Sequence, residues 1–155
     1  MNTARNIVLA ALTLSATLAA HGSSDKRITA SQLPAPVLAI AQNETKGAII
    51  KGYATEVENG ARVYEVETVV AGHTRDLQIA SDGTLNEIEE EVQFDSLSEP
   101  VRTSLMAKAK GARIVKVESL TKGGKLVAYE AATVRGTRHG EVQTGPSGET
   151  LSHEE

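Results

Sequence analysis

Hydrophobic and polar residues alternate most clearly over positions 62–70 of the chain. One face of this stretch is apolar or β-branched and the other carries carboxylates, namely Tyr64, Val66, Thr68 and Val70 against Glu65 and Glu67. A period of two is typical of a β-strand that buries one face and leaves the other in water. The preceding Asn59-Gly60 pair predicts a tight hairpin turn, so we expect this strand to belong to an antiparallel sheet.

Apolar residues recur at helical spacing in two other stretches. The second of these begins after Ser98 and ends before Gly111, and serine and glycine are common residues at those two helix boundaries. The apolar faces are formed by Val37, Ile40 and Ala41 in the first stretch and by Val101, Leu105 and Ala109 in the second. Both stretches therefore predict short helices with one buried side.

These helix and strand patterns occur twice along the chain, 64 or 65 positions apart. The recurring segments are Leu33-Pro34-Ala35-Pro36-Val37 with Leu97-Ser98-Glu99-Pro100-Val101, Lys46-Gly47-Ala48 with Lys110-Gly111-Ala112, and Tyr64-Glu65 with Tyr129-Glu130. Matches in the same order indicate an internal duplication. The predicted fold class is therefore α+β, with two tandem repeats over residues 28–93 and 96–155, each a helix packed on one face of a 3–4-stranded antiparallel sheet. We expect the matched residues Tyr64 and Tyr129 to pack beneath the helices.

The first residues of the chain have the pattern of a secretory signal peptide. Arg5 is followed by an apolar run from Ile7 to Leu12 and by small residues up to Ala20. This pattern predicts cleavage by a signal peptidase, and we assign residues 1–22 to the signal peptide. The alternative, an N-terminal membrane anchor, needs a longer and more apolar run. We therefore expect a periplasmic or secreted protein with no membrane span after cleavage.

The composition narrows the classes of partner and chemistry. The chain carries 16 basic and 20 acidic residues, with a net charge of −4, which disfavours nucleic acid as a partner. It contains no cysteine, so disulfides and thiolate metal sites are excluded. Three tyrosines and one phenylalanine leave the core to aliphatic residues and offer few surfaces on which bases or sugars could stack.

The densest group of candidate ligands is the acidic run of residues 87–91, Glu-Ile-Glu-Glu-Glu. Hard cations such as calcium prefer several oxygen ligands, but the spacing does not match that of an EF-hand. The interpretation that we favour is a solvated strand edge or a linker between the repeats, where charges discourage pairing with other strands.

Histidines and nucleophiles show no convergent pattern. His73 and His139 each follow a glycine at a predicted turn, whereas His21 lies near the predicted cleavage site and His153 among the last residues. A zinc site needs three or four ligands to converge, and nothing in this spacing brings them together. No serine lies in a Gly-x-Ser-x-Gly motif. We therefore predict no catalytic residue, no metal and no cofactor.

The order of these motifs resembles that of PepSY-like domains. The residues that carry the resemblance in the second repeat are Leu97-Ser98-Glu99-Pro100-Val101, Lys110-Gly111-Ala112, Ile114-Val115-Lys116-Val117, Lys122-Gly123-Gly124-Lys125 and Val127-Ala128-Tyr129-Glu130. The resemblance implies a fold similar to β-lactamase-inhibitor protein, a role in binding or restraining other proteins, and no catalytic residues. The chain departs from the pattern at Gly140 and Gly145-Pro146, which weaken the interior of a strand.

Together these observations predict an exported, non-enzymatic protein-binding module that inhibits or regulates an extracytoplasmic enzyme or sensor. Its partner would be another extracytoplasmic protein, and its contact surface would be the helix-free sheet face that carries Glu65, Glu67 and Glu130. The alternative is a periplasmic protein that binds a small ligand or a cation in a groove between the repeats. The sequence leaves open the oligomeric state and whether the two repeats share one sheet.

Overall fold

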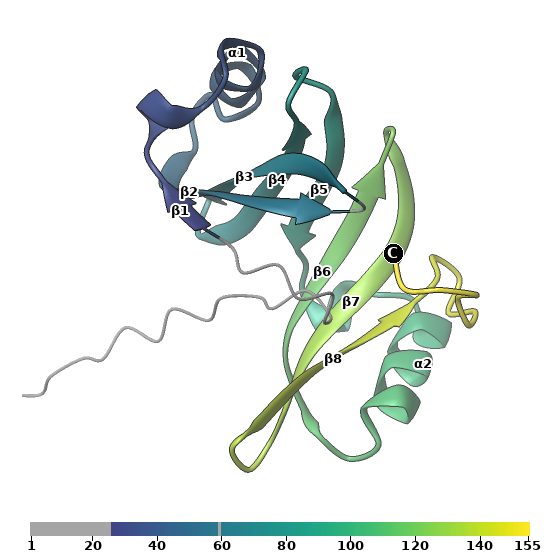
Figure 1. Cartoon of the computed structure of the whole chain (residues 1–155). Coiled ribbons are helices and arrows are strands. Elements are labelled where there is room, and N and C mark those ends of the chain that lie inside the picture. The colour runs from purple at the N-terminus through teal and green to yellow at the C-terminus, as the bar shows by residue number, and fades with distance from the viewer. Residues whose placement is uncertain (1–25, 59) are drawn as a thin grey trace, which may run out of the picture.

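One antiparallel sheet of eight strands runs through the part of the chain that the computed structural model describes, residues 26–58 and 60–155 (Figure 1). The strands pair in chain order, and they are β1 (Lys26–Ile28), β2 (Ile49–Glu58), β3 (Ala61–Val70), β4 (His73–Ala80), β5 (Leu85–Glu91), β6 (Arg113–Lys122), β7 (Lys125–Arg135) and β8 (Arg138–Thr144). The helices are α1 (Ala35–Glu44) and α2 (Glu99–Ala109), preceded by 3₁₀ turns at Ala30–Gln32 and Phe94–Ser96. The predicted signal peptide, 1–22, lies outside the described residues.

The predicted fold class of two tandem helix-on-sheet repeats is wrong, because a single eight-stranded antiparallel sheet runs through both halves of the chain. Strands β5 and β6 join the halves, with Glu87 opposite Lys122 and Glu91 opposite Glu118. The hydrophobic pattern of a strand shows which face is buried but not which strand lies beside it. Two separate sheets would each expose a row of unpaired backbone groups, and pairing β5 with β6 satisfies both rows.

Each helix closes its own hydrophobic cluster against the sheet. The α1 cluster consists of Leu33, Val37, Ala41, Tyr64, Val66, Leu77 and Ile79. The α2 cluster consists of Leu97, Val101, Leu105, Val117 and Ala131. The expected packing of Tyr64 is confirmed, and Tyr129 packs as a partly buried residue against the α2 cluster. The helices lie at opposite ends of the sheet (Figure 1).

The strand register shows that both helices cover the same face of the sheet. Ile88 of β5 packs against the α1 cluster and lies opposite Thr121 of β6. Side chains two or four residues apart along a strand point to the same face, so Thr121 shares its face with Val117, a member of the α2 cluster. The other face of the sheet carries no helix from the described residues.

Two turns that contain glycine at positive φ pack closely against the helix starts. Gly83, between β4 and β5, has φ +91°, and Gly148, after β8, has φ +86°. A Cβ on Gly83 would lie 3.1 Å from Pro36, and a Cβ on Gly148 would lie 2.6 Å from the carbonyl group of Pro100. Glycine therefore lets each turn pack against the first turn of a helix.

Arginines from the sheet bind the last turns of both helices. Arg75 of β4 donates to the carbonyl oxygen of Glu44 at 3.1 Å and lies 2.9 Å from the Glu90 carboxylate. Arg135 of β7 donates to the carbonyl oxygen of Lys110, just past α2. A cation at a helix C-terminus satisfies unpaired carbonyl groups and complements the helix dipole, so these contacts help to fix the helices on the sheet.

The hairpin predicted at Asn59-Gly60 agrees with the pairing of β2 and β3, in which Glu58 lies opposite Ala61; Asn59 itself lies outside the described residues. Gly123-Gly124 joins β6 to β7, and its φ values of +56° and +75° favour glycine. These turn predictions are confirmed. Within the residues described, no helix is long and apolar enough to cross a membrane.

Candidate functional site on the acidic face

Carboxylate side chains gather on the sheet face that neither helix covers. Strand register and alternation place the following residues there, and we call them the acidic face: Glu65 and Glu67 of β3, Asp76 of β4, Glu87 and Glu89 of β5, Glu118 of β6, Glu130 of β7 and Glu141 of β8. Lys116 and Lys122 lie among them. Glu118 is only 4% exposed and Leu120, on the same face, only 2%, so part of this face is excluded from water.

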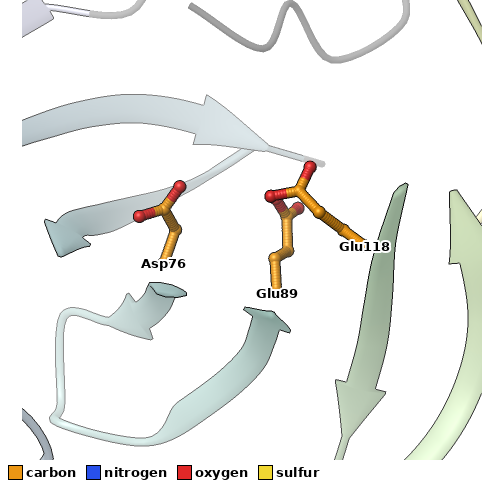
Figure 2. A group of neighbouring side chains, drawn as sticks. All are labelled: Asp76, Glu89 and Glu118. Atoms are coloured by element: carbon orange, nitrogen blue, oxygen red, sulfur yellow. The ribbon is translucent and has the colours of Figure 1, made fainter. Parts of the chain in front are cut away.

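Asp76, Glu89 and Glu118 form a close group on the acidic face (Figure 2). One carboxylate oxygen from each residue lies within 4.8 Å of the others. The three side chains come from the adjacent strands β4, β5 and β6, and Asp76 lies directly opposite Glu89 in the register. The group therefore arises from pairing between strands and not from the acidic run within one strand.

A lysine neutralises part of this group. Lys116 Nζ lies 2.5 Å from Glu118 Oε1, and Thr74 Oγ1 donates to the same oxygen at 3.3 Å. Burial lowers the pKa of Lys116, but the surrounding carboxylates raise it by more, so that the net shift is upward. Lys116 therefore carries a positive charge in the middle of the acidic face.

Burial and crowding raise the pKa values of several carboxyl groups. Burial, reinforced by neighbouring carboxylates, raises the pKa of Glu89 to about 9 and that of Glu141 to about 7. Burial raises the pKa of Asp76 to about 6, although a backbone hydrogen bond opposes the shift. Burial likewise raises the pKa values of Glu87 and Glu130. The face thus retains protons near neutral pH, and a cation that displaced them would be bound with release of protons.

The spacing of the three carboxylates suits a hard cation. Calcium takes oxygen ligands at about 2.3–2.6 Å, so oxygens within 4.8 Å of one another could contact a single ion. Lys116 already supplies one positive charge at Glu118, so an ion would compete with it. The sequence does not indicate Asp76 or Glu118 as candidate ligands, because each is an ordinary acidic residue in its own strand. Only the register of the strands brings the two side chains together.

The acidic run at residues 87–91 belongs to β5, which is paired on both sides. Its interpretation as a strand edge or a linker between repeats is wrong, because the joining of the two halves places β5 inside the sheet. Glu87 and Glu89 lie on the acidic face, whereas Ile88 packs against the α1 cluster and Glu90 binds Arg75. Successive residues of the run therefore point alternately to the acidic face and to the helix-covered face.

The three predicted contact residues lie on the acidic face, but apart from one another. Glu65 and Glu67 are on β3, and Glu130 is on β7, with three strands between them. Glu67 Oε2 lies 2.6 Å from Arg27 Nη1. Glu130 Oε2 accepts a hydrogen bond from Gln143 Nε2 at 2.6 Å. Their assignment as contact residues stays a prediction.

The described histidines lie apart. His73 and His153 each lie near a single glutamate, at 3.7 and 3.6 Å, and His139 is exposed on β8. Among the described residues, the group of three or more histidine, aspartate or glutamate side chains that lie close enough to share one metal ion is the carboxylate group in Figure 2. It contains no histidine. His21 lies outside those residues.

Comparison with known proteins identifies the fold but not the sequence family. No protein-family model and no curated protein sequence matches the chain. A solved structure from Bacteroides eggerthii, whose description proposes a periplasmic location, matches with a TM-score of 0.61 and 15% identity, over 77% of this chain and 86% of its own. A DUF2874 family protein from Bacteroides ovatus matches with a TM-score of 0.59 and 14% identity, over 77% and 85%. A BLIP-like protein from Bacteroides fragilis matches with a TM-score of 0.54 and 16% identity, over 79% and 85%.

These structures show that the chain has a BLIP-like fold. The expected similarity to β-lactamase-inhibitor protein is thus confirmed at the level of the fold. Because the sequence identities are only 14–16%, the similarity to these structures concerns the fold alone. The resemblance to PepSY-like domains stays a prediction.

Proposed function

We propose that the protein is an exported, non-enzymatic module that binds another extracytoplasmic protein through its acidic face and thereby inhibits or regulates that partner. The observation that carries the proposal is the concentration of carboxylates on the face that the helices leave open, where burial raises their pKa values. Two descriptions of similar structures support it, the periplasmic location proposed for the Bacteroides eggerthii protein and the BLIP-like assignment of the Bacteroides fragilis protein. Export through the signal peptide at residues 1–22 is part of the proposal.

The chemistry of the acidic face favours a basic partner. Lysine or arginine side chains placed beside Asp76 and Glu89 would stabilise the ionised carboxylates. Attraction between opposite charges would also speed association. Binding is therefore expected to strengthen as the pH rises from about 5 to 8, because more of these carboxyl groups ionise. It should weaken with added salt, because salt screens exposed charges.

Affinity capture from the cell envelope of the source organism, followed by measurement of Kd for the protein recovered, tests the proposal. The variant that carries Glu65→Lys and Glu67→Lys reverses two charges on the acidic face. We expect its Kd to rise by about tenfold or more, because like charges would face a basic partner. Glu99→Lys is the control for charge reversal elsewhere, with one reversed charge against two, because Glu99 is exposed on the first turn of α2, away from the acidic face.

The control variant should keep its Kd within about twofold of the wild-type value. If Glu99→Lys weakens binding as much as the double variant, the effect comes from net charge and the acidic face is not the contact surface. If neither variant weakens binding, the partner contacts another surface. Either result contradicts the proposal.

The carboxylate group in Figure 2 favours a second candidate function, the binding of a divalent cation such as calcium. Titration calorimetry with calcium chloride in two buffers of different ionisation enthalpy would detect binding and count the protons released. We expect proton release because Glu89 retains its proton near neutral pH. Glu89→Gln should abolish binding, whereas Glu90→Gln, on the other face of the same strand, should preserve it. No heat of binding at millimolar calcium would remove this candidate.

A further inference from the structure

The chain turns back after β8 and returns to the acidic face. Thr144, which is fully buried, donates from Oγ1 to the carbonyl oxygen of Glu149 at 2.9 Å. The N–H of Gly145 donates to the same carbonyl oxygen at 2.9 Å. These bonds close a tight turn, and the last residues then run back so that the end marked C lies beside β7 (Figure 1). We call residues 151–155 the return segment.

Gln143 binds the backbone of the return segment. The N–H of Glu155 donates to Gln143 Oε1 at 2.8 Å, and the carbonyl oxygen of Glu155 accepts from Gln143 Nε2 at 3.4 Å. Gln143 Nε2 also donates to Glu130 Oε2 at 2.6 Å. One side-chain amide therefore links the return segment to Glu130, one of the predicted contact residues.

The side chain of Glu155 binds a lysine of the acidic face. Lys122 Nζ lies 3.5 Å from Glu155 Oε2 and 3.5 Å from Glu87 Oε2. Two carboxylates therefore share this one ammonium group. A partner that brought its own cations to Glu87 and Glu130 would have to enter the space that Glu155 occupies.

The return segment is acidic and lies between carboxylates of the acidic face and two lysines, Lys108 and Lys110, which line a pocket together with His153 and Glu154. Ser152, His153 and Glu154 are exposed. The charge of Glu154 is among those that raise the pKa values of Glu130 and Glu141. The hydrogen bonds to Gln143 and the ion pair with Lys122 thus act against repulsion between like charges. A segment held by few contacts in this way is expected to open more easily than the sheet beneath it.

We propose that the return segment is an autoinhibitory latch, which covers the Glu130 end of the acidic face and must leave Gln143 and Lys122 before a basic partner can bind there. This inference rests on the proposed function of the acidic face. The latch reduces the apparent affinity of the face in proportion to the fraction of molecules that are closed. Opening the latch should therefore tighten binding even where it adds no attractive contact.

Gln143→Leu tests the latch with all charges retained. The substitution removes both hydrogen bonds that hold the backbone of Glu155. It also removes the hydrogen bond to Glu130, which the deletion variant below retains. The probe is a decapeptide of lysine, titrated into the whole exported chain at low salt and pH 8. We expect Kd to fall by about three- to tenfold relative to the wild type. Gln42→Leu, at an exposed position of α1, is the matched control and should leave Kd unchanged.

Deletion of residues 151–155 distinguishes a latch from a segment that only adds negative charge, because the two predict opposite changes in the Kd for the peptide. The deletion removes the carboxylates of Glu154 and Glu155, so a segment that merely adds negative charge would bind the peptide more weakly when lost. A latch predicts tighter binding after the same deletion. Unchanged or weaker binding by both Gln143→Leu and the deletion variant overturns the latch, while binding to the acidic face itself would stand.

Amide hydrogen exchange tests the closed state without any peptide. The N–H of Glu155 should exchange more slowly in the wild type than in Gln143→Leu. Equal exchange rates overturn the latch, whatever the peptide does. If Glu155 is protected but no form of the chain binds the decapeptide, the function proposed for the acidic face fails, and the inhibitory role of the segment fails with it.

Discussion

The two faces of the sheet are formed by the same strands, but one buries apolar side chains and the other buries carboxyl groups. On the helix-covered face, Val37, Val101 and Leu105 are fully buried, and each stabilises the fold by removing apolar surface from water. On the acidic face, burial raises the pKa values of Asp76 and Glu89, which means that their charged forms are disfavoured there. The helix-covered face therefore stabilises the fold, whereas the acidic face has a composition that folding does not require and that binding can explain.

The largest expected effect is the loss of a core side chain from the helix-covered face. Leu105→Ala leaves a cavity beneath α2, because Leu105 is 0% exposed. We expect the free energy of unfolding to fall by about 2–5 kcal/mol. Met106→Ala, at the next position but 54% exposed, should change it by less than about 0.5 kcal/mol. Urea denaturation followed by circular dichroism measures both free energies, and similar losses would contradict the stabilising role of the helix-covered face.

The contact between the turn at Gly148 and the start of α2 contributes the next largest effect. In Gly148→Ala the new Cβ would lie 2.6 Å from the carbonyl group of Pro100, and φ +86° is unfavourable for alanine. We expect a loss of about 3 kcal/mol, from backbone strain and overpacking together. Gly72→Ala has a similar φ of +92° and nothing within 4 Å of its Cβ, so about 1 kcal/mol is expected. Equal losses in thermal unfolding would show that the contact with Pro100 is unimportant.

The smallest of these effects comes from the acidic face and has the opposite sign. The folded protein holds the Glu89 proton up to a pKa of about 9, against an ordinary value of 4.5. The group therefore favours folding fully below the ordinary value, and this contribution is lost as the pH rises from about 5 to 9. Glu89→Gln removes that loss and should raise the free energy of unfolding at pH 8. The pKa values alone would give about 5 kcal/mol, and because Glu89 is only partly buried, solvent screening reduces the expected gain to on the order of 1–2 kcal/mol.

The pH dependence distinguishes this effect from an ordinary gain in packing. At pH 4 wild type and Glu89→Gln should have nearly equal stability, because the carboxyl group is protonated in both states there. Glu99→Gln, on the exposed first turn of α2, should shift the stability by only a few tenths of a kcal/mol at pH 8. A wild-type stability that is flat from pH 5 to 9 would mean that Glu89 is well solvated.

The features that the sequence could predict are those set by local spacing. Val101 and Leu105 repeat at helical intervals, and both are buried. The turn at Gly123-Gly124 follows from the ease with which glycine adopts positive φ. The polar side of β3 was also visible, because Glu65 alternates with buried neighbours.

The features that the sequence could not predict depend on which strands pair. Nothing in the alternation of β5 showed that its free edge would meet β6. This pairing joins the two halves in one sheet, a point that the sequence left open. The same pairing brings Asp76 and Glu118, far apart along the chain, beside Glu89. A candidate site made by strand register therefore emerges only once the register is known.

Site-specific photo-crosslinking in the envelope tests most directly whether the acidic face is the binding surface. A photoreactive amino acid would replace Glu65 on that face in one variant and the exposed Met106 on α2 in another. If the acidic face binds the partner, position 65 crosslinks to one partner protein, the crosslink is lost at high salt, and position 106 gives no crosslink to that partner. A partner captured from position 106 and not from position 65 would contradict it.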